Sequence, residues 1–297
     1  TAAGLDVDSF AWAPDGTRLA VMARHDPTHP VAAEIAIVDV ASGSLEIVAG
    51  RDGCATGATW LADGSLLFVS DESGWFQVIR RSADGRDRIA LTTGEREHGE
   101  PGGGVGHVPL GSPDGSRFVH IEVRDGLQDL VVAETAAGPA PKRGRGRPPK
   151  TPRTVAAAGV GQRLNPWDGI WRTVGWLADG EWVAAVGESE DRPQDLWLLP
   201  VPGVAAEDAR PRQITDSLPA TARAWLSTGR AGPSQRFAIV ARDGLRVEGN
   251  LHLPAGVTGK RGGRRVPTVV YPHGGPTSQT FRAFVPFKRV LTAAGFA

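Results

Sequence analysis

The sequence has little of several features that mark particular classes of protein. Its 297 residues contain one cysteine, Cys54, so neither an internal disulfide nor a site built from several cysteines can form. Lysine plus arginine equal aspartate plus glutamate at 33 each, so no overall field favours nucleic acid or a membrane surface. No apolar run approaches the length of a membrane span. We expect a cytoplasmic protein that uses no metal or other cofactor.

Helical periodicity is also missing from nearly the whole chain. Short β-rich runs separated by turns take its place, and the chain contains 39 glycines and 23 prolines. A chain of 297 residues is long enough for two domains with substantial cores. The composition therefore favours a mainly β fold, and the next question is whether the β-rich runs repeat.

One phrase recurs four times, starting at Trp12, Trp60, Gly111 and Trp176. Each copy ends in Asp-Gly and is followed by an apolar run. Asp-Gly between two apolar runs is a strong hairpin signal, because the turn needs residues with positive φ. The glycines of successive copies lie 48, 51 and 65 residues apart, which is close to the roughly 40–50 residues of a propeller blade.

A second pair of apolar runs follows each hairpin, for example 35–40 and 45–48 in the first copy. Two hairpins per copy make four strands, which is one blade of a β-propeller. We therefore predict a partial β-propeller of about four blades over residues 1–232. We expect the recurring tryptophans to pack one blade against the next, with a ligand cage as the alternative. The third copy departs from the pattern at Gly111.

Two polar stretches in the propeller have no clear role in a blade. Glu95, Glu97 and Glu100 read as a solvated acidic loop, with the binding of a substrate amine as the alternative. A basic insertion at 139–153 is rich in glycine and proline, which prevent a regular element, so we predict an exposed loop between blade strands.

The core of the basic insertion consists of Arg145, Gly146, Arg147 and Pro148. These four residues resemble the AT-hook, which lies extended in the minor groove of A·T-rich DNA. Arginine suits the narrow, electronegative groove, and glycine keeps the backbone thin enough to enter it. A solvated surface insertion is our main interpretation, and DNA binding through this core is the alternative.

The pattern changes after residue 232. Residues 237–254 read as two strands around Asp243-Gly244, and 281–294 carry the only clear helical spacing, with a start at Pro286. Between them lies V-P-T-V-V-Y-P-H-G-G-P at 266–276, which reads as a short buried strand that breaks at His-Gly-Gly-Pro. A β-β-β-α order is how an α/β-hydrolase domain begins.

Two glycines directly after a buried strand allow the backbone to turn and to approach a ligand closely. Backbone N–H groups exposed in this way at Gly274 and Gly275 can stabilise a developing oxyanion, as the loop after the third strand does in α/β-hydrolases. The alternative is an ordinary strand-to-helix turn in which the glycines only supply the geometry.

Taken together, these phrases resemble the prolyl oligopeptidase family of serine peptidases, nearest to its acylaminoacyl-peptidase or dipeptidyl-peptidase type branch. The similarity rests on the repeated turns, on D-E-S-G-W-F from Asp71, on V-E-G-N-L-H-L-P from Val247, and on the His-Gly-Gly-Pro block. It implies peptide substrates and a propeller that restricts the access of large molecules to a hydrolase domain. It also implies an oxyanion loop at His273, Gly274 and Gly275, with His273 where some relatives place an oxyanion-binding tyrosine.

The catalytic serine, aspartate and histidine of such enzymes have no counterpart in these residues. The Gly-x-Ser-x-Gly phrase that carries the nucleophile does not occur, and its expected place lies beyond Ala297. We therefore expect residues 233–297 to be the start of a peptidase domain, truncated before the nucleophile, and the chain alone to be inactive. A non-catalytic propeller that binds other proteins is the alternative.

The DNA-binding alternative predicts salt-sensitive affinity for A·T-rich duplex. Replacing both Arg145 and Arg147 by alanine should abolish that affinity, because the two guanidinium groups supply the contacts in the groove. Fluorescence anisotropy with an A·T-rich and a G·C-rich duplex at low salt measures it. Absence of binding by the unaltered chain at low salt would remove this alternative.

Overall fold

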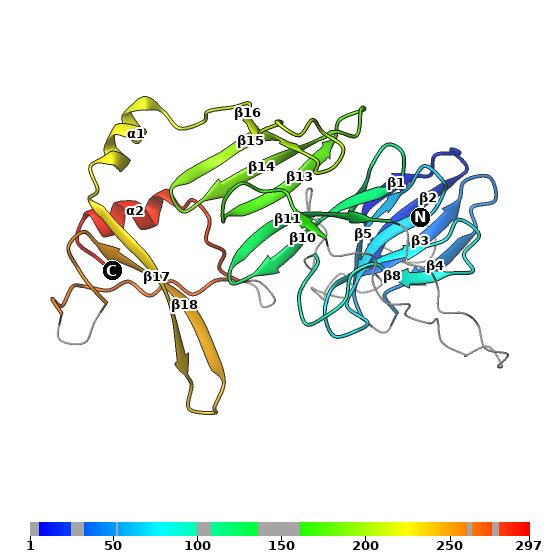
Figure 1. Ribbon diagram of the computed structural model, residues 1–297. Coiled ribbons are helices and arrows are strands. Elements are labelled where there is room, and N and C mark those ends of the chain that lie inside the picture. The colour runs from blue at the N-terminus through cyan, green and yellow to red at the C-terminus, as the bar shows by residue number, and fades with distance from the viewer. Residues whose placement is uncertain are drawn as a thin grey trace. The chain divides into compact units, whose positions relative to one another are not determined.

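Antiparallel β-sheet makes up most of the regular structure of the computed structural model (Figure 1). The structure describes residues 6–24, 33–51, 53–99, 108–135, 161–259, 263–274 and 279–297. They form two compact units, Thr1–Gly187 with Leu196–Ile214 and Glu188–Asp195 with Thr215–Ala297. Of the helices in the described residues, none is long and apolar enough to cross a membrane.

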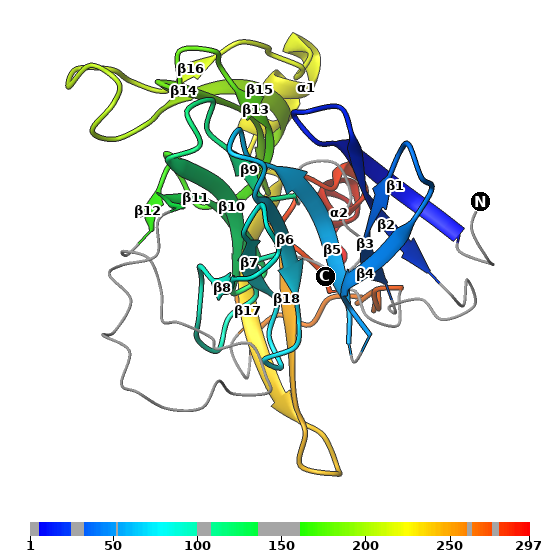
Figure 2. The ribbon, with the colours of Figure 1, turned by 90° about the vertical axis from the view of Figure 1, so that its right-hand side faces the viewer.

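The first two blades are separate four-stranded sheets in which each strand pairs with the next along the chain (Figures 1 and 2). The first blade contains β1 (Asp6–Trp12), β2 (Arg18–Arg24), β3 (Glu34–Asp39) and β4 (Leu45–Ala49). The second contains β5 (Ala55–Trp60), β6 (Leu66–Ser70), β7 (Gln77–Arg81) and β8 (Arg88–Ala90).

The third and fourth blades share one eight-stranded sheet. The third contains β9 (Leu110–Gly111), β10 (Arg117–Arg124), β11 (Leu127–Glu134) and β12 (Gln162–Arg163). The fourth contains β13 (Ile170–Trp176), β14 (Trp182–Ser189), β15 (Arg192–Pro200) and β16 (Arg212–Gln213). A single parallel pairing, Gln128 with Ile170, joins the two groups. The mainly β, propeller-like fold predicted from the repeats is thus confirmed.

The four Asp-Gly turns share one local geometry. The glycine of each turn has a positive φ, namely 69° at Gly16, 78° at Gly64, 72° at Gly115 and 70° at Gly180. The aspartate before each glycine accepts a hydrogen bond of 2.9–3.0 Å from the backbone N–H two residues on; these are Asp15, Asp63, Asp114 and Asp179. The side chain and the left-handed glycine together reverse the chain, so each copy of the phrase forms its hairpin by local interactions.

Two of the three recurring tryptophans, Trp60 and Trp176, connect neighbouring blades, as expected, whereas Trp12 is 54% exposed. Trp60 Nε1 donates a hydrogen bond to the Ala11 carbonyl oxygen at 3.1 Å, and Trp176 Nε1 donates to the Leu110 carbonyl oxygen at 2.9 Å. In each case the acceptor lies in the preceding blade, next to the first residue of its own repeated phrase. The rings therefore serve packing between blades, and the interpretation as a ligand cage is wrong for these two.

The exception at Gly111 has a steric reason. A Cβ atom at this position would lie 2.1 Å from the side chain of Leu61, which is buried in the second blade. In the third blade, the side chain of Leu61 from the second blade therefore occupies space next to Gly111, where a larger residue such as the tryptophan of the other copies would not fit. A similar constraint applies inside the fourth blade, where a Cβ at Gly187 would lie 2.5 Å from the fully buried ring of Trp171.

The second unit contains α1 (Ala220–Ser227), β17 (Ala231–Val240), β18 (Arg246–Pro254) and α2 (Pro286–Ala293). The predicted hairpin is present, and Gly244 in its turn has a φ of 88°. The predicted helix also begins at Pro286, where a proline without an N–H costs no hydrogen bond. The helix α1 was not expected from the sequence.

The predicted buried strand through Val269, Val270 and Tyr271 is wrong in its burial. The three side chains are exposed to 44%, 85% and 71%, and the segment is extended without belonging to an assigned sheet. Among the described residues, its backbone pairs with Ala297, whose N–H donates to the Pro267 carbonyl and whose carbonyl accepts from the Val269 N–H, both at 2.8 Å. A strand is buried only when neighbours cover both of its faces, and one partner residue does not do this.

That one pairing nevertheless has a definite pattern. A residue that bonds to the two positions on either side of its partner is paired in the parallel sense. The chain therefore runs from the extended segment at 267–271 through α2 to a parallel neighbour at Ala297. A parallel pairing whose two members are joined through a helix is the connection found in strand–helix–strand crossovers.

A pair of histidines lies buried in the first unit. His98 and His120 are 7% and 3% exposed, and their ring centroids are 5.1 Å apart. Neither ring nitrogen of His98 has a hydrogen-bond partner among the described residues. Glu97 beside it is half-buried, and its Oε2 accepts a hydrogen bond from the Phe76 N–H at 2.6 Å. The acidic loop predicted here is therefore solvated only in part: Glu95 is exposed, whereas Glu97 and His98 are drawn inward.

The buried histidines predict a loss of stability in mild acid. Burial lowers the pKa of both side chains from 6.5, and the proximity of His98 contributes to bringing the pKa of His120 to about 3. Because the unfolded chain binds these protons near pH 6.5 and the folded chain does not, stability is complete above that pH and falls as the pH falls below it. The slope is about 1.4 kcal/mol per pH unit for each histidine that stays neutral.

Urea unfolding of the chain at pH 7.5, 6.0 and 5.0 measures this effect. The variant His120→Phe should have a smaller slope, because phenylalanine stacks equally well near Phe118, whose ring centroid is 5.3 Å from that of His120. Glu122 and Arg96 face His98 with opposite charges and remain in both proteins. An unchanged slope in the variant would contradict this assignment.

Candidate active site

The candidate oxyanion loop begins directly after the extended segment at 267–271. His273 and Gly274 lie in the described part of the chain, whereas Gly275 lies outside it. His273 Nδ1 is 2.8 Å from the Gly274 carbonyl oxygen, so with a proton on Nδ1 the imidazole donates to the backbone of its own loop. Of the two roles that the family resemblance implies for His273, this contact favours shaping the loop.

Gly274 lies in open surroundings. A Cβ atom added there would meet no atom of the described residues within 4 Å. Among the described residues, none accepts a hydrogen bond from the Gly274 N–H. A backbone donor with open space beside it is what an oxyanion site requires, because the donor must be free for charge that develops in the transition state.

The segment that leads out of the loop contacts the tip of the β14–β15 hairpin, which belongs to the second unit. The Arg282 Nη2 and Nε atoms lie 2.9 Å and 3.3 Å from Glu190 Oε2. The Phe284 N–H donates to Glu188 Oε2 at 3.1 Å. These two glutamates were not singled out in the sequence, because an acidic turn in a propeller hairpin looks like ordinary solvated surface.

Several ionisable groups surround Glu190. Burial by itself would raise the pKa of this carboxyl, but hydrogen bonds from Ser234 and Arg282 and the nearby cations outweigh burial, so the net pKa is lowered. Burial is the largest cause of the lowered pKa values of His252 and Lys288, and the charge of Lys288 lowers that of His252 further. Glu190 is therefore an anion that partly neutralises the nearby cations, Arg282 before α2 and Lys288 within it.

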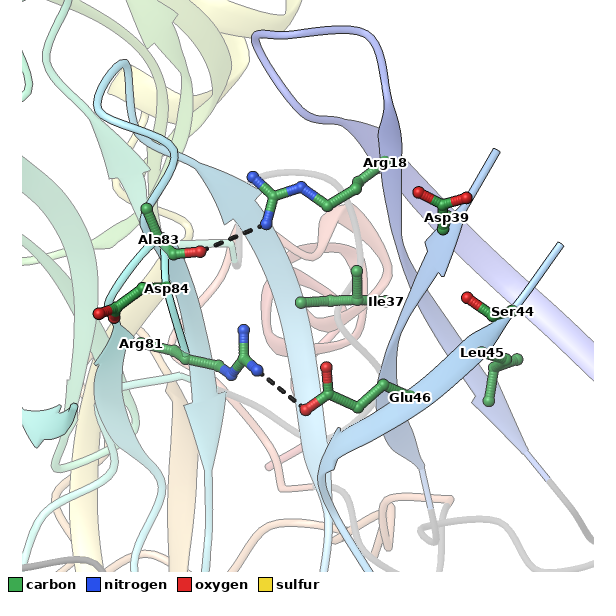
Figure 3. Close-up of a pocket in the computed structure, with 9 residues that line it drawn as sticks. All are labelled: Arg18, Ile37, Asp39, Ser44, Leu45, Glu46, Arg81, Ala83 and Asp84. Carbon is green, nitrogen blue, oxygen red and sulfur yellow. Dashed lines mark hydrogen bonds and ion pairs between the residues drawn. The ribbon is translucent and has the colours of Figure 1, made fainter. Parts of the chain in front are cut away.

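A cavity of about 270 Å³ lies elsewhere, between the first two blades (Figure 3). Its two arginines reach across the blade boundary in opposite directions. Arg18 donates to the Ala83 carbonyl oxygen at 3.4 Å, and Arg81 pairs with Glu46 at 2.9 Å. Arg18 also stacks on Trp60, with 4.9 Å from its Cζ atom to the ring centroid. These contacts join the first blade to the second through polar side chains that line the cavity.

Two further sequence expectations concern DNA binding and metal binding. The possible DNA-binding residues Arg145, Gly146, Arg147 and Pro148 lie outside the described residues. The part of the chain that the structure describes contains no group of three or more histidine, cysteine, aspartate or glutamate side chains that could hold a metal ion.

Comparison with solved structures gives matches over the whole chain. A puromycin-hydrolyzing peptidase from Mycobacterium tuberculosis matches with a TM-score of 0.72 at 22% identity, over 100% of this chain and 41% of that one. A puromycin hydrolase matches with a TM-score of 0.70 at 21% identity, over 98% of this chain and 40% of that one. Oligopeptidase B from Trypanosoma brucei matches with a TM-score of 0.62 at 13% identity, over 99% of this chain and 38% of that one.

No protein-family model and no curated protein matches the sequence. The chain spans about two fifths of the length of the solved peptidases that it matches, at 41% and 40% of the first two. At identities of 22% or less, the likeness concerns the fold. The resemblance inferred from the sequence is confirmed at that level: this chain has the fold of the propeller-containing part of a prolyl oligopeptidase family enzyme.

Proposed function

We propose that the chain is the propeller and the beginning of the catalytic domain of a prolyl oligopeptidase family serine peptidase that acts on peptides in the cytoplasm. The observation that carries the proposal is a match to such peptidases over the whole chain, from the first blade to the end of α2, with TM-scores of 0.72 and 0.70. The proposed division is a propeller at 1–232 and the start of an α/β-hydrolase domain at 233–297.

The local geometry at 267–297 supports the hydrolase part of the proposal. An extended segment, the glycine-containing phrase that begins at His273, a helix and a parallel neighbour at Ala297 follow one another in the order that an α/β-hydrolase uses around its oxyanion loop. The exposed apolar side chains of Val270 and Tyr271 are of the kind that further strands and helices of such a sheet would cover.

In the proposed reaction, a serine attacks the carbonyl carbon of a peptide bond and the carbonyl oxygen becomes an oxyanion. The Gly274 and Gly275 N–H groups donate hydrogen bonds to that oxygen, and the His273 ring fixes the loop through the Gly274 carbonyl. The nucleophile, its histidine base and the aspartate are not assigned to any of the 297 residues, because none of the serines stands in a Gly-x-Ser-x-Gly phrase. The propeller restricts which substrates reach the site.

Proline substitution in the loop tests the role of the backbone donors. Gly274→Pro and Gly275→Pro each remove one N–H and should lower kcat by about 10²–10³ in a protein that includes the nucleophile. Gly274→Ala is the matched control, since it keeps the N–H and its Cβ has open space. Puromycin and short peptide amides are suitable substrates, because two of the matched structures are named for puromycin hydrolysis.

Fluorophosphonate labelling separates the possible outcomes. The 297-residue chain should not be labelled, whereas a longer reading frame that supplies Gly-x-Ser-x-Gly should be. Equal activity in Gly274→Pro, Gly275→Pro and the alanine control would remove the oxyanion assignment. A reading frame with no such serine would remove the peptidase proposal and favour a propeller that binds other proteins.

A further inference from the structure

The tip of the β14–β15 hairpin, residues 188–195, contacts two other segments of the second unit. Although its flanking strand residues belong to the first unit, the tip belongs to the second. Its first half contacts the segment between the candidate loop and α2. Its second half contacts the segment at 215–217, where the Asp195 carboxylate accepts hydrogen bonds from the Thr215 hydroxyl at 2.9 Å and from the Ser217 N–H at 2.8 Å.

Glu190 makes two different kinds of contact with the segment that follows the loop. Its side chain, 14% exposed, forms an ion pair with Arg282, which is 31% exposed. Its backbone carbonyl accepts two hydrogen bonds from the Arg289 guanidinium, 2.7 Å from Nη2 and 3.2 Å from Nε. Asp191 pairs with the same guanidinium. Arg282 lies before α2 and Arg289 lies within it. The turn of the hairpin therefore contacts both the helix and the segment that leads into it.

Glu188 adds a contact from a buried residue. Its residue is 4% exposed, and its two carboxylate oxygens accept from the Phe284 N–H at 3.1 Å and from Gln194 Nε2 at 2.9 Å. A buried carboxylate that accepts a backbone N–H helps to fix the position of the main chain, because the carboxylate would lose a charge-assisted hydrogen bond that little water is at hand to replace. The main chain two residues before α2 is thereby tied to the hairpin.

The other end of the loop is tied independently. The parallel pairing of Pro267 and Val269 with Ala297 holds the strand that leads into His273. His273 and Gly274 thus follow a backbone pairing at Pro267 and Val269, and the chain is held again by the two glutamates at Arg282 and Phe284. Residues 275–278, between these two points, lie outside the described residues. A loop whose donors must lie within about 0.5 Å of their working position requires such support from its surroundings.

We propose that Glu188 and Glu190 are positioning residues for the candidate oxyanion loop, and that they act by fixing the main chain at Arg282 and Phe284. The inference rests on the proposed function of the loop. The clamp itself is a property of the 297-residue chain, so it can be tested apart from catalysis.

The charges around Glu190 indicate what its loss would do. Arg282, Lys288 and His252 are the cationic or titratable groups near its carboxylate, while Arg289 contacts its backbone carbonyl and pairs with Asp191. Replacing Glu190 by glutamine keeps the shape of the side chain but removes the anion beside Arg282 and Lys288. The segment at 281–289 should then open more often, while the blades of the first unit should not change.

Hydrogen–deuterium exchange of the 297-residue chain is the direct measurement. Glu190→Gln should raise exchange in peptides that cover 279–289 by about tenfold, as expected when one partner of a partly buried ion pair is removed. Glu248→Gln is the matched control, because it removes a carboxylate from an exposed pair with Arg236 on the β17–β18 hairpin. Unchanged exchange in Glu190→Gln would overturn the clamp.

The same variants in a protein that includes the nucleophile test the positioning role. Glu190→Gln and Glu188→Gln should lower kcat by about tenfold with little change in KM, since a displaced oxyanion donor weakens binding of the transition state more than of the substrate. An intact kcat together with faster exchange would overturn the positioning role and leave a purely structural clamp. Loss of the proposed peptidase function would instead appear as inactivity of the unaltered protein, whatever the exchange result.

Discussion

The first unit depends on one local interaction that the chain repeats: an aspartate that accepts a backbone hydrogen bond beside a glycine in the left-handed region. The hydroxyl of Ser112 and then the N–H and hydroxyl of Ser116 hold the pKa of Asp114 at about 2, so this turn keeps its charged acceptor under mildly acid conditions. Because four turns use the same glycine conformation and the same aspartate hydrogen bond, four hairpins start at the same place in the repeated phrase. Three of them also close with the same spacing, from Ala13 to Arg18, Ser112 to Arg117 and Leu177 to Trp182, while the second is one residue shorter, from Leu61 to Ser65. The tryptophan hydrogen bonds at Trp60 and Trp176 then join blades that are already formed locally.

Repetition made the first unit predictable from sequence. The Asp-Gly turns and the apolar runs that follow them specify strands by short-range rules, and the four copies agree with one another. The exceptions follow from contacts between copies, which spacing does not reveal. At Gly111 the absence of a side chain leaves room for Leu61 of the neighbouring blade. The inward position of His98 is a further exception, since nothing in an acidic, glycine-rich stretch predicts a buried histidine.

The candidate site was predictable in part. The residues of the loop, which are adjacent in sequence, were predicted, whereas the residues that support it from distant positions in the chain were not. His273 and Gly274 stand in a phrase that signals a glycine turn after an apolar run, so the loop was expected. Its supports come from far along the chain: Glu190 and Arg282 are 92 positions apart, and Glu188 and Phe284 are 96. A single sequence holds no pattern that pairs residues over such distances. The burial predicted for Val269 to Tyr271 failed for a related reason, because burial is decided by neighbours and not by the segment itself.

The two kinds of support also differ in how they respond to conditions. The turns of the blades are held by short-range hydrogen bonds within a few residues, which reform as soon as the local chain folds. The exit of the candidate loop is held by charges brought together over long distances, in a place where Glu190 is largely shielded from solvent and Arg282 is about one-third exposed. Screening by salt weakens an ion pair of this exposure in part, and it acts less on the contact of Glu188 with the Phe284 N–H, because Glu188 is buried and its partner carries no formal charge. Of the two contacts after the candidate loop, the one at the Phe284 main chain should therefore respond less to salt than the one at the Arg282 side chain.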